Sequence, residues 1–344
     1  MTYNNLIWLI PLMVCISLKS VTASTLTAST SQISSEVVEY EFYQFVSQYN
    51  RLYNSVDEFL LRRDLFKKNY NYIIQHNSDN HSYTLSMNQF GDRLPKELPK
   101  THFPTKMLSN YQEPYQLKAL FNNVRLPSAV DWVKLGYVTP VENQLQCGSC
   151  WSFSASEEVS SLYKKTSGKL VSLSKQQLMD CSKPEGDMSC EGGLMTDAFE
   201  YVLKNNGLCT EEDYSYLATD EQVCNKCTPV ATINGYYNIP SNNETALMVA
   251  LSQLPVSIAI EADQSSFQFY SSGVYSDIKC GTNLDHGVQL VAYGKDSRTN
   301  KLTWKIKNSW GAEWGDNGYI TVERSVPGHP EGLCGLTLSA SQVF

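Results

Sequence analysis

Residues 144–153 of this chain read Gln144-Leu145-Gln146-Cys147-Gly148-Ser149-Cys150-Trp151-Ser152-Phe153. Directly after the second cysteine, apolar residues recur at helical spacing, and Gly168 follows as a stop signal. The pattern places Cys150 at the N-terminus of a helix, where the helix dipole favours the negatively charged thiolate. We therefore expect Cys150 to be a catalytic nucleophile.

The composition of the 344-residue chain is that of a globular protein, with 42% apolar and 18% charged residues. Its length predicts about two domains. The formal net charge is −8, and no basic block is present. A nucleic acid is therefore not an expected partner.

The N-terminus carries an apolar run from Leu6 to Leu18, followed by the small-residue pattern Val21-Thr22-Ala23. We interpret residues 1–23 as a secretory signal that is cut after Ala23. A membrane anchor is the alternative, but roughly 13 apolar residues fall short of the roughly 20 needed to span a bilayer. No other apolar run is long enough, so we expect no membrane span.

Cysteines are distributed unevenly. The chain has ten, of which Cys15 lies in the expected signal, and the other nine all lie from Cys147 onward. An odd number in an oxidising compartment predicts one unpaired thiol. No cysteine lies between residues 24 and 146, which indicates that this segment and the cysteine-rich remainder are separate parts of the protein.

Two amphipathic helices are expected after a polar lead at residues 24–35. The first begins near Glu36. The second carries six residues that fall on one stripe about 100° wide. They are Glu58, Arg62, Phe66, Asn69, Ile73 and Asn77.

Those six residues resemble the ERFNIN motif in the pro-region of papain-like cysteine proteases. A second pro-region motif of that family, Gly-x-Asn-x-Phe-x-Asp, is matched by Ser86, Asn88, Phe90 and Asp92, with Ser in place of Gly. The resemblance implies that residues 24–125 form a helical, inhibitory propeptide of the I29 type. The stretch Leu126-Pro127-Ser128-Ala129-Val130-Asp131-Trp132 is similar to the start of the mature enzymes, so we expect the mature domain at 126–344.

In the remainder of the chain, the predicted secondary structure changes from helices to strands near residue 235. Helical patterns are expected after Cys150, at Leu173 to Met179 and at Leu194 to Lys204. Strand patterns follow at Val256–Ile260, 287–293, Leu302–Lys307 and 319–322. We predict an α+β fold with a helical subdomain at about 126–235 and a β subdomain at about 236–344. Residues 102–123 read as an extended linker suited to proteolytic cutting.

A thiol protease needs a base beside its nucleophile. Of the five histidines, His76, His81 and His102 lie in the segment expected to be removed, and His329 lies in a turn-like Pro-Gly-His-Pro stretch. His286, at the entry of a predicted strand, is left as the base. A lone histidine there is more often a structural core residue, but the elimination and the unpaired cysteine favour catalysis.

Two further side chains complete the predicted site. The amide oxygen of Asn308 can accept a hydrogen bond from the imidazole, and Trp310 would cover that bond. Gln144 and the backbone N–H of Cys150 would form the oxyanion hole. Alone, Asn308 could be an ordinary turn residue, and Gln144 is a weak signal.

Together, Gln144, Cys150, His286 and Asn308 resemble the catalytic set of the papain family. His286 and Asn308 lie 136 and 158 residues after Cys150, close to the family's spacing of about 130–150. The resemblance implies a papain-like two-subdomain fold, with a helical left domain and an antiparallel β-barrel-like right domain. It also implies peptide hydrolysis through a Cys–His thiolate–imidazolium pair and a thioester.

The same resemblance implies three disulfides, Cys147–Cys190, Cys181–Cys224 and Cys280–Cys334. The odd cysteine count then favours a fourth, Cys209–Cys227. The alternative for Cys224 and Cys227 is a metal site, since they have C-x2-C spacing, but no second such pair completes it. We expect neither a metal nor a cofactor.

Substrate preference in this family comes mainly from the S2 pocket, whose expected walls are apolar or small. They map onto Leu194, Met195, Ala259, Leu284 and Gly287, with Ser339 at the base, and Gly192 and Gly193 map onto the S1 wall. The set predicts a cathepsin L-like endopeptidase that prefers hydrophobic P2 side chains.

Processing and partners follow from the same reading. Asn80 and Asn243 head candidate N-glycosylation sequons. We expect the secretory pathway, ending in a lysosome-like compartment or outside the cell, a monomer, peptide and protein substrates, and inhibition by its own propeptide and by cystatin-type inhibitors. Acid should trigger activation as carboxylates in ion pairs protonate. A peptide ligase and a catalytically silent binding homologue remain as alternatives.

Overall fold

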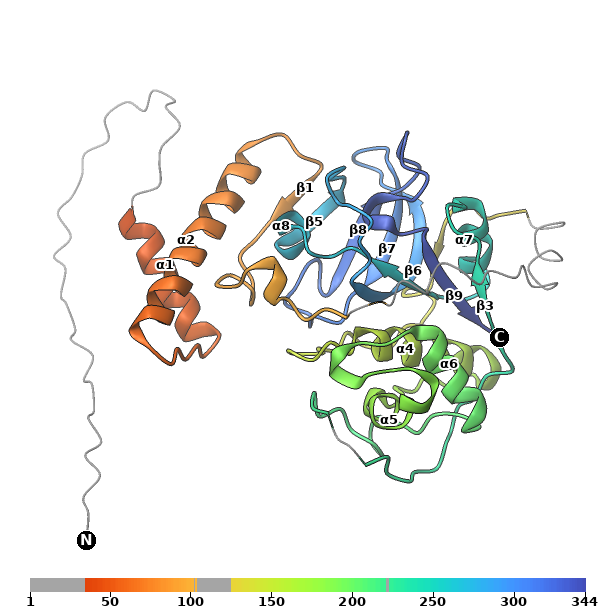
Figure 1. Ribbon diagram of the computed structural model, residues 1–344. Helices are drawn as coiled ribbons and strands as arrows, with labels where there is room; N and C mark the ends of the chain where they lie inside the picture. The colour runs from red at the N-terminus through yellow and green to blue at the C-terminus, as the bar shows by residue number, and fades with distance from the viewer. Residues whose placement is uncertain (1–34, 102, 104–124, 221–222) are drawn as a thin grey trace, which may run out of the picture.

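The computed structural model describes residues 35–101, 103, 125–220 and 223–344. The expected signal and most of the expected linker lie outside these residues. The described chain forms a helical N-terminal part, a helical subdomain and a sheet (Figure 1).

The N-terminal part contains helices α1 (Ser35–Gln48) and α2 (Val56–Ser78), strand β1 (Tyr83–Leu85) and the 3-10 turn η1 (Pro95–Glu97). Ser55 starts α2 because its hydroxyl accepts a hydrogen bond from the backbone N–H of Glu58, 3.1 Å away. The two helices cross over a cluster of buried aromatic rings, Phe42, Phe45 and Phe66. Burial of these rings holds the pair together.

The polar residues of the predicted α2 stripe tie the helix to the chain that follows it. Arg62 pairs with Glu97 at 2.7 Å and more distantly, at 3.9 Å, with Glu58 one turn earlier on the same helix. The amides of Asn69 and Asn77 bond to backbone groups in and after β1. The stripe therefore positions residues 85–97, which follow the helix.

The helical subdomain contains α4 (Cys150–Ser167), α5 (Lys175–Cys181), α6 (Met195–Lys204) and the short turns η3 (Lys183–Glu185) and η4 (Ser189–Glu191). Gly168 ends α4 as predicted, with a left-handed φ of 77°. The second helix begins two residues later than predicted because Ser174 is its N-cap and accepts from the N–H of Gln177 at 2.9 Å.

The sheet is built mainly by the C-terminal third of the chain. Its strands are β2 (Val130–Asp131), β3 (Tyr236–Ile239), β4 (Val256–Ile260), β5 (Tyr270–Tyr275), β6 (His286–Lys295), β7 (Leu302–Lys307), β8 (Tyr319–Glu323) and β9 (Ser339–Val343). The helices α7 (Glu244–Leu251) and α8 (Ser265–Gln268) and the turn η5 (Leu333–Gly335) lie between them.

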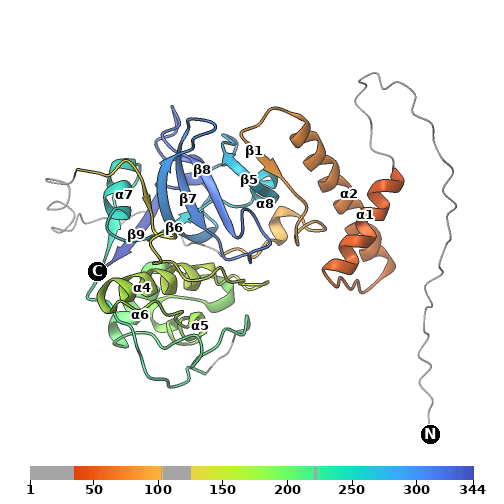
Figure 2. The ribbon, with the colours of Figure 1, turned by 180° about the vertical axis from the view of Figure 1, so that it is seen from behind.

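The strand order is β1-β5-β8-β7-β6-β4-β9-β3, and β2 pairs with β6. The pairs are antiparallel as expected, except that β5 and β8 run parallel. Strand β1 of the N-terminal part adds to the free edge of β5, with Tyr83 opposite Gly273. Both ribbon views show α2 and β1 beside α8 and β5, on the side of the sheet away from α7 (Figures 1 and 2).

The boundary expected near residue 235 does not separate the two halves cleanly. Val130 and Asp131, in the helical half of the sequence, pair with β6. At the other end, Val343 of β9 belongs to the core of the helical subdomain. Each half therefore contributes a terminal segment to the other.

Two buried carboxylates of α4 fasten the helix to the sheet. Glu157 pairs with Lys307 of β7 at 2.7 Å, and both side chains are at most 4% exposed. Burial raises the pKa of Glu157 and lowers that of Lys307. The oxygens of Glu158 accept hydrogen bonds from the backbone N–H groups of Ser257 and Val343, each at 2.7 Å. Because burial dominates, the pKa of Glu158 rises to about 8.

Replacing Glu157 by Gln should lower the free energy of unfolding by roughly 3–5 kcal/mol, because Lys307 would be left buried without an opposite charge. Urea unfolding of the zymogen, followed by tryptophan fluorescence, measures the change. The matched control is Glu200→Gln, which removes an exposed pair with Lys204 and should leave the urea midpoint unchanged. Equal midpoints for the Glu157 and Glu200 variants would contradict the prediction.

Candidate active site

Cys150 is the first residue of α4, and its side chain is fully buried. Among the nine cysteines of the described chain, it alone is outside a disulfide. The backbone N–H of Gly287, on β6, donates to its sulfur at 3.2 Å. A sheet amide and the N-terminus of a helix thus both face the sulfur, and both favour negative charge on it.

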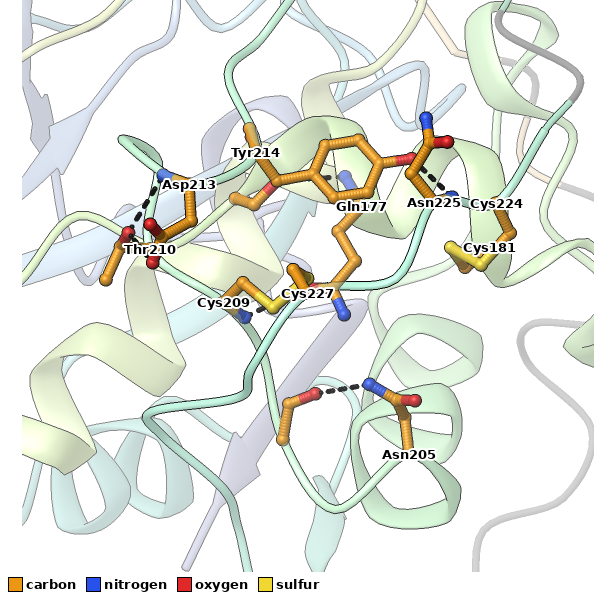
Figure 3. The surroundings of a disulfide bond; sticks show 12 residues. Gln177, Cys181, Asn205, Cys209, Thr210, Asp213, Tyr214, Cys224, Asn225 and Cys227 are labelled. Atoms are coloured by element: carbon orange, nitrogen blue, oxygen red, sulfur yellow. Dashed lines mark hydrogen bonds between the residues drawn. A yellow bond between two sulfur atoms is a disulfide. The ribbon is translucent and has the colours of Figure 1, made fainter.

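The other eight cysteines form four disulfides. The pairs are Cys147–Cys190, Cys181–Cys224, Cys209–Cys227 and Cys280–Cys334. Cys209–Cys227 lies close to Cys181–Cys224 (Figure 3). Because Cys224 and Cys227 belong to different disulfides, the metal alternative for that C-x2-C pair fails.

His286 begins β6, and Asn308 directly follows β7. The antiparallel pairing of these strands brings the two side chains together, with His286 Nε2 2.7 Å from Asn308 Oδ1. Asn308 Oδ1 is an acceptor and also receives the N–H of Ser309 at 2.8 Å. The imidazole proton therefore lies on Nε2. His286 Nδ1 has no hydrogen-bond partner in the described chain and is left to act as a base.

Trp310 lies over the imidazole, with ring centroids 4.8 Å apart and planes inclined by 30°. Its own ring is 1% exposed and packs against Phe267 and Trp314. The indole thus lies against the imidazole that is bonded to Asn308.

In this covered state, burial favours the uncharged forms of Cys150 and His286. Burial raises the pKa of Cys150 to about 12, against the opposing effect of the Gly287 amide. Burial likewise lowers the pKa of His286 to about 4, against the opposing bond to Asn308. Exclusion of water thus favours a neutral thiol and a neutral imidazole.

Gln144 lies beside the nucleophile with a fixed side-chain amide. Its Oε1 accepts from the hydroxyl of Ser309 at 2.7 Å, and its Nε2 donates to the carbonyl of Cys147 at 2.9 Å. The backbone N–H of Gln144 also bonds to the Ser309 carbonyl at 2.9 Å. One N–H of Nε2 has no partner among the described residues, and an oxyanion can take that place.

Most of the expected S2 residues adjoin one another on the sheet and at the start of α6. Ala259 stands opposite Gly287 on one side and opposite Ser339 on the other. A Cβ at Gly287 would lie 3.2 Å from the sulfur of Met195, so a larger residue there would fit only if its neighbours shifted. Leu284 packs against the same apolar cluster.

The expected S1 glycines, Gly192 and Gly193, directly precede Leu194, which also belongs to the expected S2 set. Gly192 has a φ of 122°, which favours glycine, and a side chain at Gly193 would collide with Asp187. Asp187 also accepts the N–H of Leu194 at 2.8 Å. The N–H of Gly193 donates to the hydroxyl of Thr101, a propeptide residue, at 3.1 Å.

The propeptide bridges the two sides of the site. Thr101 accepts from Gly193 on the helical side and donates its backbone N–H to the carbonyl of Asp285 on the sheet side, at 3.0 Å. Lys100 forms an ion pair with Asp285 at 2.9 Å and with Asp263 at 3.3 Å. Residues 100–101 therefore connect Gly193 on the helical side with Asp285, the residue before His286, on the sheet side. No pattern in the sequence had pointed to Lys100 or Thr101.

A second contact of the N-terminal part lies behind His286. The ring of Phe90 packs edge-on against Trp310, with centroids 5.1 Å apart. Gln89 donates to the carbonyl of Trp310 at 2.6 Å, and Asn88 donates to that of Gln268 at 2.8 Å. The second pro-region motif thus packs against the tryptophan that shields the base.

Family models match nearly all of the described chain. The papain family cysteine protease model matches residues 126–344, and the cathepsin propeptide inhibitor domain (I29) model matches residues 42–98. This chain belongs to the papain family of cysteine proteases. As a papain-family enzyme with a cathepsin-type propeptide, it is a cysteine protease made as a zymogen, as the sequence predicted.

Individual relatives agree with that placement. The chain is 42% identical to human cathepsin L2 over 315 residues, covering 88% of this chain and 91% of that protein. It is 41% identical to a senescence-specific cysteine protease of Oryza sativa subsp. indica over 302 residues, covering 87% and 88%.

Among solved structures, the proform of the ragweed pollen allergen Amb a 11 superimposes with a TM-score of 0.81 at 34% identity, covering 90% of this chain and 95% of that one. Digestive procathepsin L 3 of Tenebrio molitor gives a TM-score of 0.77 at 34% identity, covering 89% and 99%. Both are precursor structures, which agrees with the zymogen assignment.

The two candidate sequons lie apart from the site. Asn80 is exposed directly after α2. Asn243 is partly buried and caps α7, accepting the N–H of Ala246 at 2.9 Å. No helix in the part of the chain that the structure describes could cross a membrane.

Replacing Phe90 by Ala should speed self-processing of the zymogen several-fold, because the propeptide would lose its aromatic contact with Trp310 while the peptidase residues stay intact. Appearance of the mature band on gels at one fixed pH measures the rate. Tyr40→Ala, on the exposed side of α1, is the control and should process at the parent rate. An unchanged rate for Phe90→Ala would show that this contact does not hold the propeptide in place.

Proposed function

We propose that residues 126–344, once freed of residues 24–125, act as an endopeptidase in which Cys150 is the nucleophile, His286 the acid and base, and Asn308 the residue that orients His286. One observation carries this assignment. His286 Nε2 is occupied by Asn308 at 2.7 Å and Nδ1 is open, while the next residue, Gly287, contacts the Cys150 sulfur.

In the proposed acylation step, the Cys150 thiolate attacks the substrate carbonyl and forms a carbon–sulfur bond. The oxyanion accepts hydrogen bonds from Gln144 Nε2 and the backbone N–H of Cys150. His286 gives its Nδ1 proton to the amine as the peptide bond breaks. In the second step, His286 takes a proton from water, the hydroxide attacks the thioester, and the thiolate leaves as the carboxylic acid forms.

The ion pair that this mechanism needs belongs to the uncovered enzyme. In the zymogen, burial keeps both partners neutral. When residues 100–101 leave, water reaches the site and the penalty on charge falls, so the proton can move from Cys150 to His286. The two groups titrate as a pair, and the pH–rate profile reports values for the pair.

Substrate preference is proposed to follow from the apolar S2 walls. Met195 and Ala259 are almost fully buried in one cluster, and Leu284 adds an apolar side chain. Neither these residues nor Ser339 carries a charge that would pair with an Arg at P2. Hydrophobic and aromatic P2 side chains should therefore bind best, in keeping with the likeness to cathepsin L2.

A peptide ligase would use the same nucleophile, but an amine would take the place of water as the acyl acceptor. A catalytically silent homologue would lack a working catalytic set. Hydrolysis is favoured because the relatives are named as proteases. The silent reading is disfavoured because Cys150, His286 and Asn308 are all present. His286 is bonded to Asn308, and the next residue, Gly287, contacts the Cys150 sulfur.

Incubating the processed enzyme with a mixed peptide library should yield hydrolysed internal bonds with Leu, Phe or Tyr enriched at P2. Mass spectrometry of the products, in ¹⁸O-labelled water, measures both results. Cys150→Ala should lower the cleavage rate by at least about 10³-fold, and Ser152→Ala, beside it on α4, serves as the control.

Three results would each count against part of this proposal. Ligated products without ¹⁸O would favour the transpeptidase. Arg dominant at P2 would overturn the pocket assignment. Full activity of Cys150→Ala would remove the nucleophile.

We also propose that acid opens the zymogen, and His76 of α2 supports this. It is 7% exposed, its Nε2 lies 3.3 Å from the carbonyl of Tyr83, and its ring stacks on His81 with centroids 4.0 Å apart. Burial is the main cause that lowers its pKa below 6.5, and Asp79 and Asp277 oppose the shift. The open form therefore binds the proton better than the closed form. Stability is lost as the pH falls from about 6.5 toward the lowered pKa.

Protonation of Glu97 should also destabilise the closed zymogen, at a lower pH than protonation of His76. Burial alone would raise its pKa, but the hydrogen bonds from Arg62 and Leu94 together lower it. The stability that this carboxylate contributes is present above its ordinary pKa of 4.5 and is lost as the pH falls through the lowered value.

Self-processing should accelerate as the pH falls from 7 to 5, and His76→Gln should move that acceleration to lower pH because glutamine does not titrate. Processing rates over a pH series measure the midpoint. His329→Gln, in a turn of the peptidase domain, is the control and should keep the parent midpoint. A rate independent of pH in the parent zymogen would refute acid opening altogether.

The remaining expectations concern the cell. We propose entry into the secretory pathway through residues 1–23 and delivery to a lysosome-like compartment or to the outside. The four disulfides support an oxidising route. Glycans at Asn80 or Asn243, a monomeric state and inhibition by cystatin-type proteins belong to the same proposal.

A further inference from the structure

A tyrosine outside the catalytic set joins the two sides of the proposed oxyanion hole. The hydroxyl of Tyr216 donates to the backbone carbonyl of Gln144 at 2.8 Å and lies 2.7 Å from the hydroxyl of Ser149. Gln144 supplies one oxyanion donor through its side chain, and Ser149 directly precedes Cys150, whose N–H is the other. Gln144 and Ser149 are both fully buried.

The direction of the protons follows from the chemistry of the three groups. A carbonyl only accepts, so the single proton of Tyr216 is given to Gln144. Ser149 must then donate its own proton to the oxygen of Tyr216. Burial, opposed by the bond with Ser149, raises the pKa of Tyr216, so the hydroxyl stays protonated in the working range of the enzyme.

The hydroxyl of Ser149 is committed to this contact. Ser149 is the N-cap residue of α4, yet its side chain makes no capping bond to the helix. A serine in that position would ordinarily cap the helix through its oxygen. Here it links the residue before the nucleophile to Tyr216 instead.

Tyr216 is itself held from two directions. Its ring packs edge-on against Phe153 of α4, with centroids 4.9 Å apart. Its backbone N–H donates to Glu211 at 2.6 Å, and Glu211 lies 3.7 Å from the buried ammonium of Lys175. Lys175 also pairs with Glu142, two residues before Gln144. The tyrosine therefore has little freedom to follow movements of the loop at residues 144–149.

We propose that Tyr216 is a positioning residue that fixes the separation of the two oxyanion donors, the amide of Gln144 and the backbone N–H of Cys150. The inference rests on the proposed function, since it assigns Gln144 and Cys150 to the oxyanion hole. In the described chain the hydroxyl of Tyr216 bonds to Gln144 and Ser149 and makes no hydrogen bond to the sulfur or to His286, so it should act on stabilisation of the oxyanion more than on formation of the thiolate.

A neighbouring tyrosine provides a matched control. Tyr214 lies on the same segment, and its hydroxyl donates to Asp180 at 2.7 Å and accepts the N–H of Asn225 at 3.2 Å. Figure 3 shows this ring next to Asn225 and the Cys181–Cys224 disulfide. Loss of that hydroxyl removes two hydrogen bonds that do not involve Gln144 or Ser149.

The test compares Tyr216→Phe with Tyr214→Phe in the processed enzyme. Tyr216→Phe should lower kcat/KM for a peptide amide about tenfold, because two hydrogen bonds are lost without loss of a donor itself. Affinity for a peptide aldehyde, whose adduct places an oxygen in the hole, should fall by a similar factor. The rate and pH profile of alkylation by iodoacetamide, which needs the thiolate but no oxyanion hole, should stay within about twofold of the parent.

Tyr214→Phe should keep all three quantities at parent values, even if it unfolds more easily. Ser149→Ala is a second variant in case Tyr216→Phe does not fold, and it should lower kcat/KM and aldehyde affinity about threefold with unchanged alkylation. The inference is overturned if Tyr216→Phe or Ser149→Ala keeps the parent's affinity for the aldehyde. It is also overturned if the alkylation rate falls by the same factor as the aldehyde affinity.

Failure of this inference and failure of the proposed function give different results. If the parent enzyme hydrolyses peptides and Cys150→Ala does not, a normal Tyr216→Phe variant refutes only the positioning role. If the parent enzyme cleaves no peptide, aldehyde binding to Cys150 still measures whether Tyr216 shapes the hole.

Discussion

The contact between the start of α4 and the start of β6 is the constraint on which the remainder of the molecule depends. It places the Cys150 sulfur 3.2 Å from a sheet amide next to His286, although the two residues come from different subdomains. Such a site works only if the subdomains cannot slide. The buried pair of Glu157 with Lys307, and Glu158 bonded to two strands, fix the helix on the sheet.

The propeptide lies across the same interface between the subdomains and blocks the site there. Thr101 bonds to both sides of the site, and its segment excludes the water that a charged Cys–His pair requires. Phe90 adds a contact behind the histidine, against Trp310. Inhibition therefore needs no distortion of the catalytic groups, which already have the arrangement proposed for turnover.

The sequence predicted the fold class and the local structure around the proposed site because each carries a local signal. The start of α4 and the strand that begins near His286 could be inferred from residue spacing, and the single free thiol from the odd cysteine count, whereas the pairing of Cys147 with Cys190 came only from the family resemblance. Strands β3, β5 and β9 were missed because their polar and small residues, as in Ser339–Val343, show no clear alternation. Contacts made by Lys100, Thr101 and Tyr216 had no signal, since they arise only when distant segments meet.

The placement of the disulfides has a consequence for how activation ends. All four lie within residues 147–334, and no cysteine stands between residues 24 and 146. The intact chain therefore keeps its inhibitor at an effective concentration set by one covalent connection. A single cut in that connection turns the inhibitor into a separate molecule, and dilution alone then favours its departure. Mass action thus makes release a one-way step at low protein concentration.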